Sequence, residues 1–466
     1  MKTTKRVIAV VLAVLMLALA VPFAASAATS SFTLKCDRPG FEFSIYPLAT
    51  VNDTTGAFEI LETVTDNNVK NEINKSTAGT ADLLAACKNS EGLGTATDVF
   101  KSADNATQSF TKTNGIYFVK CTKMPLNGKE VLRDSIVVLP LPDTYTDAVV
   151  DLTDKVAVLG EPTVVKDFKV GNNLTRSAQT FGSDDTITYV LTADITGSVD
   201  NHLTDYAISD TMGTGLDTSV VNVQSVQLVN AQGTKVRDIT EYTLKGANLS
   251  TKFSAADTAL IGSDKTFAIF LGSTELAKAD FYTTGNKVVV TYETKLAANA
   301  PINTDIPNQD FLSWKNSSGK NSKPGNTVVA KTYKIQALKV DAQTDEPLAG
   351  ATFTLYQADG TTVIATATSV AGTGIANFNK LLPAGTYVVK ETGVPQDYML
   401  NTTVTKVVLG DGDKDDLVTV KIGDTKKKTP NTGGAGTMAF TIVGGSLIVL
   451  AGVLFVVVMK KRKASK

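Results

Sequence analysis

The 466-residue chain has very little of the residue types that most catalytic and metal sites need. It contains a single histidine, His202, so a His-rich metal site is excluded and a Ser-His-Asp triad could form only around that residue. The neighbours Asn201 and Thr204 favour a loop, and we interpret His202 as an ordinary loop residue. Walker, GxGxxG and HExxH motifs are also absent, so we expect no cofactor and no metal.

Cysteine is almost as scarce, with Cys36, Cys87 and Cys121 all in the first third of the chain. An odd number allows at most one intramolecular disulfide and leaves one thiol over. A CxxC spacing is absent, which argues against a redox or zinc motif. Disulfides cannot be the main cross-links of so long a chain, and burial or a structural role is the better interpretation.

An aspartate-rich run at 411–416 begins like a calcium-binding loop. Its sixth position is Asp416 where an EF-hand has Gly, and its twelfth is Ile422 where an EF-hand has Glu. The pattern fails, and we expect a hairpin turn whose charges are solvated.

The amino-terminal end has the organisation of an export signal. Three basic residues precede an apolar stretch at 7–20, and a small-residue sequence, Ala-Ser-Ala, ends at Ala27. This pattern predicts a leader over 1–27 that is cleaved after Ala27 or Ala28.

The carboxyl-terminal end carries an apolar run at 438–459, long enough to cross a bilayer because about 20 residues at a rise of about 1.5 Å suffice. The basic tail at 460–466 fixes its end in the cytoplasm. The residues directly before the run are Thr429, Pro430, Asn431, Thr432 and Gly433.

This order of polar motif, apolar run and positive tail resembles the sorting signal of Gram-positive surface proteins, which a sortase joins to the cell wall or to one another. The resemblance implies cleavage between Thr432 and Gly433 and transfer of the Thr432 carbonyl to an amine. Thr429 stands where the usual motif has Leu. A simple tail anchor would explain the apolar run and the charges but not the Pro-Asn-Thr-Gly sequence.

The mature chain is acidic although the whole chain has a formal net charge of only −1. Residues 28–432 contain 37 basic and 46 acidic residues, which gives a net charge near −9. This charge disfavours nucleic acid and anionic membrane as partners and suits a soluble protein exposed at the cell wall.

Composition and patterning predict an all-β fold. Thr, Val, Ala, Gly and Asp dominate, short alternating runs are broken by Asn-Gly, Asp-Gly and Pro, and long helical periodicities are scarce, with one short helix expected at 80–88. We predict three tandem immunoglobulin-like β-sandwiches. Their expected bounds are 28–160 (the first domain), 161–331 (the middle domain) and 332–425 (the third domain), followed by a stalk at 426–437.

Strands are expected at particular alternating runs, and the late polar run of the middle domain is expected to be a loop. The Asn-, Ser- and Gly-rich residues 316–326 are predicted to form this surface loop, and Trp314 before them is expected in the core. The predicted strands include 41–46, 56–61, 116–119 and 135–139 in the first domain, and 162–166, 186–191, 206–211 and 288–292 in the middle domain.

The third domain contains Lys339 on its first strand, then PLAGATFTLY at 347–356 and GTYVVKET at 385–392, with Pro395 and Tyr398 following. This order resembles the B-type Cna repeat domain of Gram-positive adhesins and pilins, which is immunoglobulin-like. The resemblance implies an intramolecular isopeptide bond. Lys339 would be the amine donor, Glu391 the proton shuttle and Asp424 the acceptor.

The alternation of each strand supports this assignment independently of the family. A charge on the core side is costly, and burial lowers the pKa of an amine and raises that of a carboxyl, which yields the neutral nucleophile and protonated acid that amide formation needs. For one residue alone, a solvated charge or a buried ion pair would be the better interpretation, but three in the expected order favour the bond. Apolar residues share the face of each: Ile335 and Ala337 with Lys339, Tyr387 and Val389 with Glu391, and Val418, Val420 and Ile422 with Asp424.

The middle domain offers a second set of the same kind. Lys166 and Asp210 each alternate with apolar residues, and Asn308 follows in the sequence PNQDFLSW, where Asp310 shares its phase. The segment resembles the A-type Cna-like middle domain of Gram-positive pilins. The resemblance implies a bond between Lys166 and Asn308 assisted by Asp210. In both domains the bond is expected to tie the first strand to the last.

Shaft-forming pilins join the threonine of the sorting signal to a lysine of the next subunit, usually in a Tyr-Pro-Lys motif at the end of the first domain. Lys155 occupies that place here, after Thr153 and Asp154. The alternative is an ordinary exposed lysine at a strand end.

These observations favour a structural protein, the backbone subunit of a sortase-assembled pilus, with sortase, other subunits and peptidoglycan as partners. The alternative is a monomeric wall-anchored adhesin that binds a host or neighbour-cell ligand. A secreted enzyme is disfavoured, because the sequence lacks a recognisable catalytic set beyond the self-reacting groups.

Overall fold

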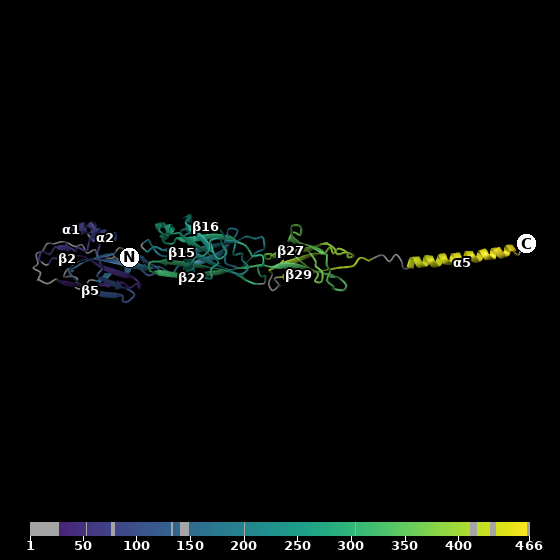
Figure 1. The fold of residues 1–466 in the computed structure, drawn as a ribbon, viewed down its shortest axis with the longest axis horizontal. Helices are drawn as coiled ribbons and strands as arrows, with labels where there is room; N and C mark the ends of the chain where they lie inside the picture. The colour runs from purple at the N-terminus through teal and green to yellow at the C-terminus, as the bar shows by residue number, and fades with distance from the viewer. Residues whose placement is uncertain are drawn as a thin grey trace, which may run out of the picture. The chain divides into compact units, whose positions relative to one another are not determined.

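The computed structural model describes residues 28–463 except 53, 76–79, 132–133, 140–148, 200, 303, 411–416 and 429–434. The predicted leader and the five residues of the sorting motif lie outside the described residues. Strands dominate the described part, which confirms the predicted all-β architecture (Figure 1). The chain divides into two compact units, Met1–Thr332 and Tyr333–Lys466, so the first and middle domains share one unit.

The first domain is built from short strands around an aromatic core that includes Phe43 and Phe100, whose ring centroids lie 6.0 Å apart. A short 3₁₀ helix, η1 (Thr153–Lys155), precedes its last strand. One sheet has the order β5 (Thr107–Thr113), β1 (Thr29–Lys35), β9 (Val149–Asp151); a second has β3 (Phe58–Ile60), β2 (Glu42–Val51), β6 (Gly115–Lys123), β8 (Ser135–Val138), with β4 (Asp98–Lys101) on β2; and β7 (Gly128–Glu130) pairs with β10 (Val156–Val158).

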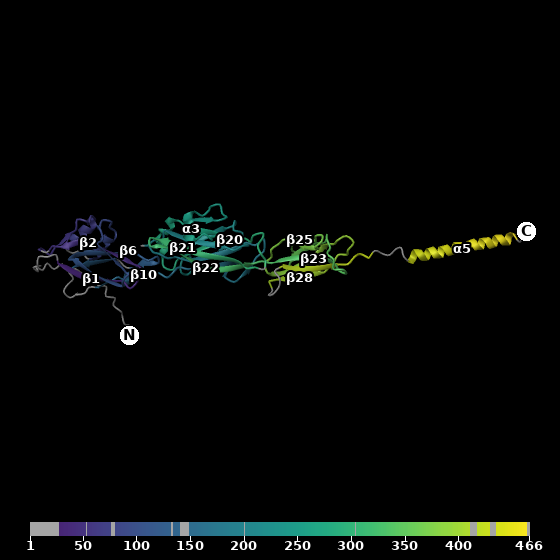
Figure 2. The same cartoon turned by 60° about the horizontal axis from the view of Figure 1, so that its bottom comes forward.

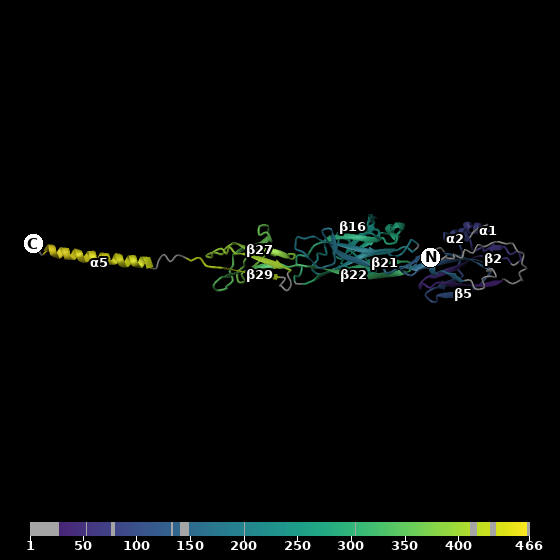
Figure 3. The same cartoon turned by 180° about the vertical axis from the view of Figure 1, so that it is seen from behind.

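Two helices cover part of this domain and lie side by side (Figures 1 and 3). The expected helix is confirmed as α2 (Thr80–Lys88). A second helix, α1 (Asn67–Asn74), was not predicted, although Asp66 caps it by accepting hydrogen bonds from the Asn68 and Val69 backbone amides. The helix is difficult to predict because its sequence is polar, and its apolar pattern consists of the two buried residues Val69 and Ile73.

The three cysteine thiols are free and buried. Burial raises the pKa of Cys87 to about 12 and raises that of Cys121 further. A reactive thiolate at these positions is therefore disfavoured, and the thiols act as small apolar side chains in the core.

The middle domain is a sandwich of two six-stranded sheets (Figure 2). It also contains α3 (Ala255–Ile261), α4 (Ser273–Leu276) and η2 (Ala279–Tyr282), which were not predicted. One sheet has the order β12 (Asn173–Thr175), β11 (Val164–Val170), β14 (Ile187–Asp194), β20 (Lys287–Thr294), β16 (Asn222–Val229), β17 (Lys235–Asp238); the other has β13 (Gln179–Thr180), β22 (Gly319–Lys331), β21 (Ile306–Asn316), β15 (Asp205–Met212), β19 (Phe267–Leu271), β18 (Tyr242–Gly246).

The predicted surface loop at 316–326 is wrong. Strand β22 begins at Gly319, and its polar residues pair with β21, for example Asn321 with Trp314. The first half of β22 is an edge of the sheet, because β13 pairs with β22 only at Ala330 and Lys331, at its C-terminal end. Polar side chains can therefore face solvent while the backbone completes the ladder.

The same strand changes where the middle domain's site lies. Because β22 follows β21, Asn308 lies on the penultimate strand and not, as expected, on the last. Trp314 is completely buried, as predicted.

The third domain is a smaller sandwich, with β27 and β29 in its two sheets (Figure 3). Its first and last strands are parallel neighbours, with Asp341 opposite Asp424. One sheet has the order β26 (Ile375–Asn377), β23 (Lys334–Asp341), β29 (Leu417–Asp424); the other has β25 (Val363–Thr368), β24 (Thr352–Gln357), β27 (Gly385–Gly393), β28 (Val404–Leu409).

The chain after the third domain stays attached for two residues longer than the expected stalk boundary implies. Lys426 forms a β-bridge with Tyr398, and the Lys427 amide donates to the Asp397 carbonyl at 2.8 Å. Helix α5 (Ala435–Lys463) includes the predicted apolar run, and its segment Met438–Arg462 is long and apolar enough to span a membrane.

Trp314 gives a direct test of the middle domain's packing, because it is the single tryptophan of the chain and is fully buried. We expect blue-shifted fluorescence in the folded protein and a red shift on thermal unfolding of the middle domain. Emission spectra recorded against temperature check this, with Trp314→Phe as the blank. Emission typical of solvated indole in the folded protein would contradict the burial.

Candidate functional site

The third domain brings together the three residues predicted to react. Lys339 comes from β23, Asp424 from β29 in the same sheet, and Glu391 from β27 in the facing sheet. The Lys339 Nζ lies 2.8 Å from Glu391 Oε2 and forms an ion pair with Asp424, and all three side chains are 0% exposed. The Phe353 ring lies 5.8 Å from the amine and contributes to its apolar surroundings.

The acid of this cluster is held in place by a residue that sequence reasoning missed. The Asn401 backbone amide donates to Glu391 Oε2 at 3.1 Å, and its side-chain amide donates to the Gly423 carbonyl at 2.8 Å. Asn401 thus connects the proposed shuttle to the residue just before Asp424. No motif could have indicated it, because one of its two contacts is a backbone group in a loop.

The electrostatics favour a protonated acid at Glu391. Burial raises the pKa of this carboxyl, and the neighbouring Asp424 carboxyl raises it further, while the contact with Lys339 opposes both. Two carboxyls beside one amine cannot both ionise cheaply in an apolar core, so a proton is available within the cluster.

The middle domain brings together its predicted set as well. Lys166 on β11 projects from one sheet toward Asp210 on β15 and Asn308 on β21 in the other. Its Nζ lies 2.7 Å from Asp210 Oδ2 and 2.8 Å from Asn308 Oδ1, and none of the three is exposed. Burial lowers the pKa of Lys166 and raises that of Asp210, while each of the two charges opposes the shift of the other.

Tyr292 on β20 completes this cluster and was not predicted as a site residue. Its hydroxyl donates to Asp210 Oδ2 at 2.8 Å and accepts from Asn308 Nδ2 at 2.8 Å. The second contact fixes the orientation of the amide, so that Asn308 Oδ1 points at Lys166. The expected strand at 288–292 contained Tyr292, but its position relative to the other sheet cannot be read from one strand.

Asn326 holds the strand that carries the amine. The Lys166 backbone amide donates to Asn326 Oδ1 at 2.8 Å, and Asn326 Nδ2 donates to the Lys166 carbonyl at 2.8 Å. These two bonds fasten β22 to β11. Sequence reasoning missed this residue because it placed Asn326 in a surface loop.

Both clusters have what acyl substitution at a carboxyl or carboxamide requires. Each has an amine beside an acyl carbon, an acid that can exchange a proton with it, and an interior that excludes water. Attack of the amine nitrogen would form a new amide and release water from Asp424 or ammonia from Asn308.

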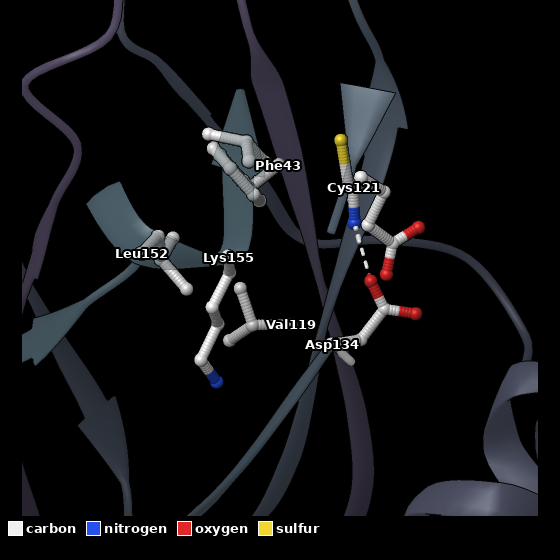
Figure 4. Close-up of a pocket in the computed structure, with 8 residues that line it drawn as sticks. Phe43, Val119, Cys121, Asp134, Leu152 and Lys155 are labelled. Carbon is white, nitrogen blue, oxygen red and sulfur yellow. Dashed lines mark hydrogen bonds between the residues drawn. The ribbon is translucent and has the colours of Figure 1, made fainter. Parts of the chain in front are cut away.

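Lys155 differs from the ordinary exposed strand-end lysine of the alternative interpretation. It is the last residue of η1, is half-buried and contacts the Ser135 hydroxyl. It lines a small hollow with Glu130 and Asp134, whose Oδ1 accepts from the Cys121 amide at 3.1 Å (Figure 4). Burial lowers the pKa of Lys155, and the two acids oppose this.

Within the described ranges, no group of three or more His, Cys, Asp or Glu side chains is arranged to hold a metal ion. His202 is exposed and stacks on Tyr282, with ring centroids 5.6 Å apart.

Two family matches cover the end of the chain. Residues 333–426 match the SpaA family, described as a prealbumin-like fold domain, and residues 424–466 match the LPXTG cell wall anchor motif. Among curated proteins, none matches the chain.

Solved structures similar to the chain include three subunits of bacterial pili. The major pilin subunit BcpA of Bacillus cereus has 15% identity and a TM-score of 0.45, with 86% of this chain and 100% of that one covered. The major pilin SpaD of Corynebacterium diphtheriae has 19% identity and a TM-score of 0.44, with 86% and 98% covered. A group B streptococcus pilus 2b backbone protein has 23% identity and a TM-score of 0.39, with 56% and 97% covered.

The family matches define the class of the protein. Its third domain is of the prealbumin-like SpaA type, and it ends in a sorting signal with an apolar helix. The anchor motif and the apolar helix identify the chain as a surface protein that is attached to the cell wall.

The two buried lysines give a test that separates the domains. Lys166→Ala leaves Asp210 buried without its cation, which costs about 3–5 kcal/mol, so the Trp314 fluorescence transition should move to lower temperature. Lys339→Ala should leave that transition unchanged, because Lys339 lies in the other compact unit. Equal shifts in the two variants would contradict this assignment.

Proposed function

We propose that this chain is the backbone subunit of a sortase-assembled pilus, hardened by two intramolecular isopeptide bonds, Lys339–Asp424 and Lys166–Asn308. The observation that carries the proposal is that each fully buried lysine contacts an acyl group from another strand and an acid. A role in ordinary stabilisation accounts less well for this, because buried ion pairs contribute little net stability.

The proposed chemistry balances within each cluster. In the third domain the neutral Lys339 amine attacks the carbon of the protonated Asp424 carboxyl. The protonated Glu391 gives its proton to the departing hydroxyl, which leaves as water, and then takes a proton from the lysine nitrogen as the amide forms. In the middle domain the Lys166 ammonium gives one proton to Asp210, and the amine attacks the Asn308 carbon. A second proton passes from the lysine nitrogen to the departing amide nitrogen, which leaves as ammonia. The products are two amides that carry no charge, so the cost of burying the lysine charges disappears.

The bonds would lie on the path of a pulling force. A load on the third domain enters at β23 and leaves after β29, and a Lys339–Asp424 bond joins these two strands directly. In the middle domain the bond would join β11 to β21, and the exit strand β22 is held by its ladder with β21 and by Asn326. The sandwich between the bonded residues would then bear load without unfolding.

For assembly we propose that Lys155 accepts the Thr432 acyl group of another subunit. Sortase would break the Thr432–Gly433 bond, and the Lys155 nitrogen would replace the enzyme on the Thr432 carbonyl. Glu130 and Asp134 beside Lys155 support this role, since they can take the proton that the attacking amine loses. At the base of the pilus, an amine of peptidoglycan would accept the Thr432 acyl group in place of Lys155.

Intact-mass spectrometry tests the two bonds. The mature chain, Ala28–Thr432, should weigh about 35 Da less than its residues predict, since about 18 Da leaves as water and about 17 Da as ammonia. Glu391→Ala should restore only the larger loss and Asp210→Ala only the smaller. A full residue mass in the unaltered chain would reject both bonds.

Immunoblots of cell wall extracts test the polymer. Cells with the unaltered chain should show a ladder of high-mass species that Lys155→Ala abolishes. Lys101→Ala, which removes an exposed lysine of the same domain, should keep the ladder. A single band from the unaltered chain would instead favour the wall-anchored adhesin, and a ladder in Lys155→Ala would assign the linkage to another lysine.

A further inference from the structure

Asp310 is a second buried acid in the middle domain, and the proposed chemistry does not yet use it. It lies directly opposite Asp210 in the ladder between β21 and β15, and two residues after Asn308 on the same strand. Alternation therefore places Asp210, Asn308 and Asp310 on the one face that Lys166 meets. The residue is 0% exposed, and its carboxyl accepts no hydrogen bond from another described residue.

The strand is built to make room for this carboxyl. The ladder between β21 and β22 shifts register between Gln309 and Phe311, a bulge that can redirect a side chain. Gly325 lies across from it, and a Cβ there would collide with the Asp310 carboxyl and lie 2.6 Å from the Val164 carbonyl. The carboxyl is thus packed between β22 and β11, the strand that carries Lys166.

The charges around Asp310 are few. Lys166 and Asp167 are on β11, and Asp210 is on β15. Asp310 also contacts Gly325 of β22, which has no charge. Arg176 Nε lies 2.9 Å from Asp167 Oδ1 and neutralises that acid. Lys265 lies over the ring of Phe311, whose side chain is on the opposite face of β21, so Lys265 does not face Asp310. Burial raises the pKa of Asp310 to about 6, against the attraction of Lys166, and an ionised Asp310 in turn raises the pKa of Lys166.

The net charge of the cluster after bond formation depends on the protonation of Asp310. Isopeptide formation consumes the positive charge of Lys166, so any carboxylate left beside it would be buried without a cation, which is strongly unfavourable. The site can finish neutral only if Asp310 is already protonated when Lys166 passes its proton to Asp210.

We propose that Asp310 is a proton-holding residue of the middle-domain site, whose neutral form permits the Lys166–Asn308 bond to form and whose ionised form blocks it. With Asp310 neutral, the Lys166 ammonium gives a proton to the Asp210 carboxylate, and the amine attacks the Asn308 carbon. The lysine nitrogen loses a second proton as the carbon–nitrogen bond of the amide breaks, and neutral ammonia leaves. Both carboxyls end protonated. Asp310 acts on Lys166 through its charge, and this inference rests on the proposed function.

The experiment follows bond formation while the mature chain folds for the first time. The mature chain is isolated unfolded from inclusion bodies, refolded at pH values from 5 to 8, and sampled for intact mass. The loss of about 17 Da should slow about tenfold or more as the pH rises through 6, since a one-unit rise in the amine pKa lowers its neutral fraction tenfold. In Asp310→Asn, which cannot ionise, this slowing should vanish.

Two controls keep the result interpretable. The loss of about 18 Da in the third domain of the same molecules is an internal clock for refolding. Asp167→Asn removes a neighbouring acid that Arg176 already neutralises, and it should keep the pH dependence of the unaltered chain. Trp314 fluorescence reports whether each variant has folded its middle domain.

The outcomes are distinct. If Asp310→Asn folds and still slows as the pH rises through 6, or if the unaltered chain does not slow, the role of Asp310 is overturned while the bond stands. If the unaltered chain never loses ammonia at any pH, the proposed function of the middle domain fails as well. If Asp310→Asn does not fold, Asp310→Ser is used with the same criterion.

Discussion

A lysine amine enclosed in the core of a β-sandwich, shielded from solvent and with a carboxyl beside it, is the constraint on which both sites depend. Lys166 and Lys339 are each 0% exposed and each is paired with an acid. An ammonium in such a place is held at high cost, and the nearby acid offers a way to remove the charge. The proposed condensation would turn this unfavourable burial into a neutral amide, so that the fold itself would supply the driving force.

The chemistry proposed for the two sandwiches is the same, but their topologies differ. In the third domain the reacting residues lie on parallel neighbouring strands, and the acid comes from the facing sheet. In the middle domain the amine and the acyl group lie on facing sheets, and Tyr292 orients the amide between them. The middle domain also continues for one strand after the strand that carries Asn308, and Asn326 fastens that last strand to Lys166.

Strand alternation was sufficient to predict which charged residues face the core, and it correctly placed Lys339, Glu391 and Asp424 on inner faces. It could not supply contacts that depend on register between sheets, such as the hydroxyl of Tyr292, or on a backbone amide, such as that of Asn401. Composition misled at 319–326, because an edge strand tolerates the polar residues that loops also favour. The half-burial of Lys155 depends on neighbours that are distant in the sequence, so it could not be predicted from the sequence either.

The central claim is that buried amines become covalently bonded to acyl groups of other strands. The most direct test digests the denatured mature chain and sequences its peptides by tandem mass spectrometry. The account predicts two branched peptides, one joining Lys339 to Asp424 and one joining Lys166 to Asn308, in place of the corresponding linear ones. Recovery of all four segments as linear peptides would contradict it.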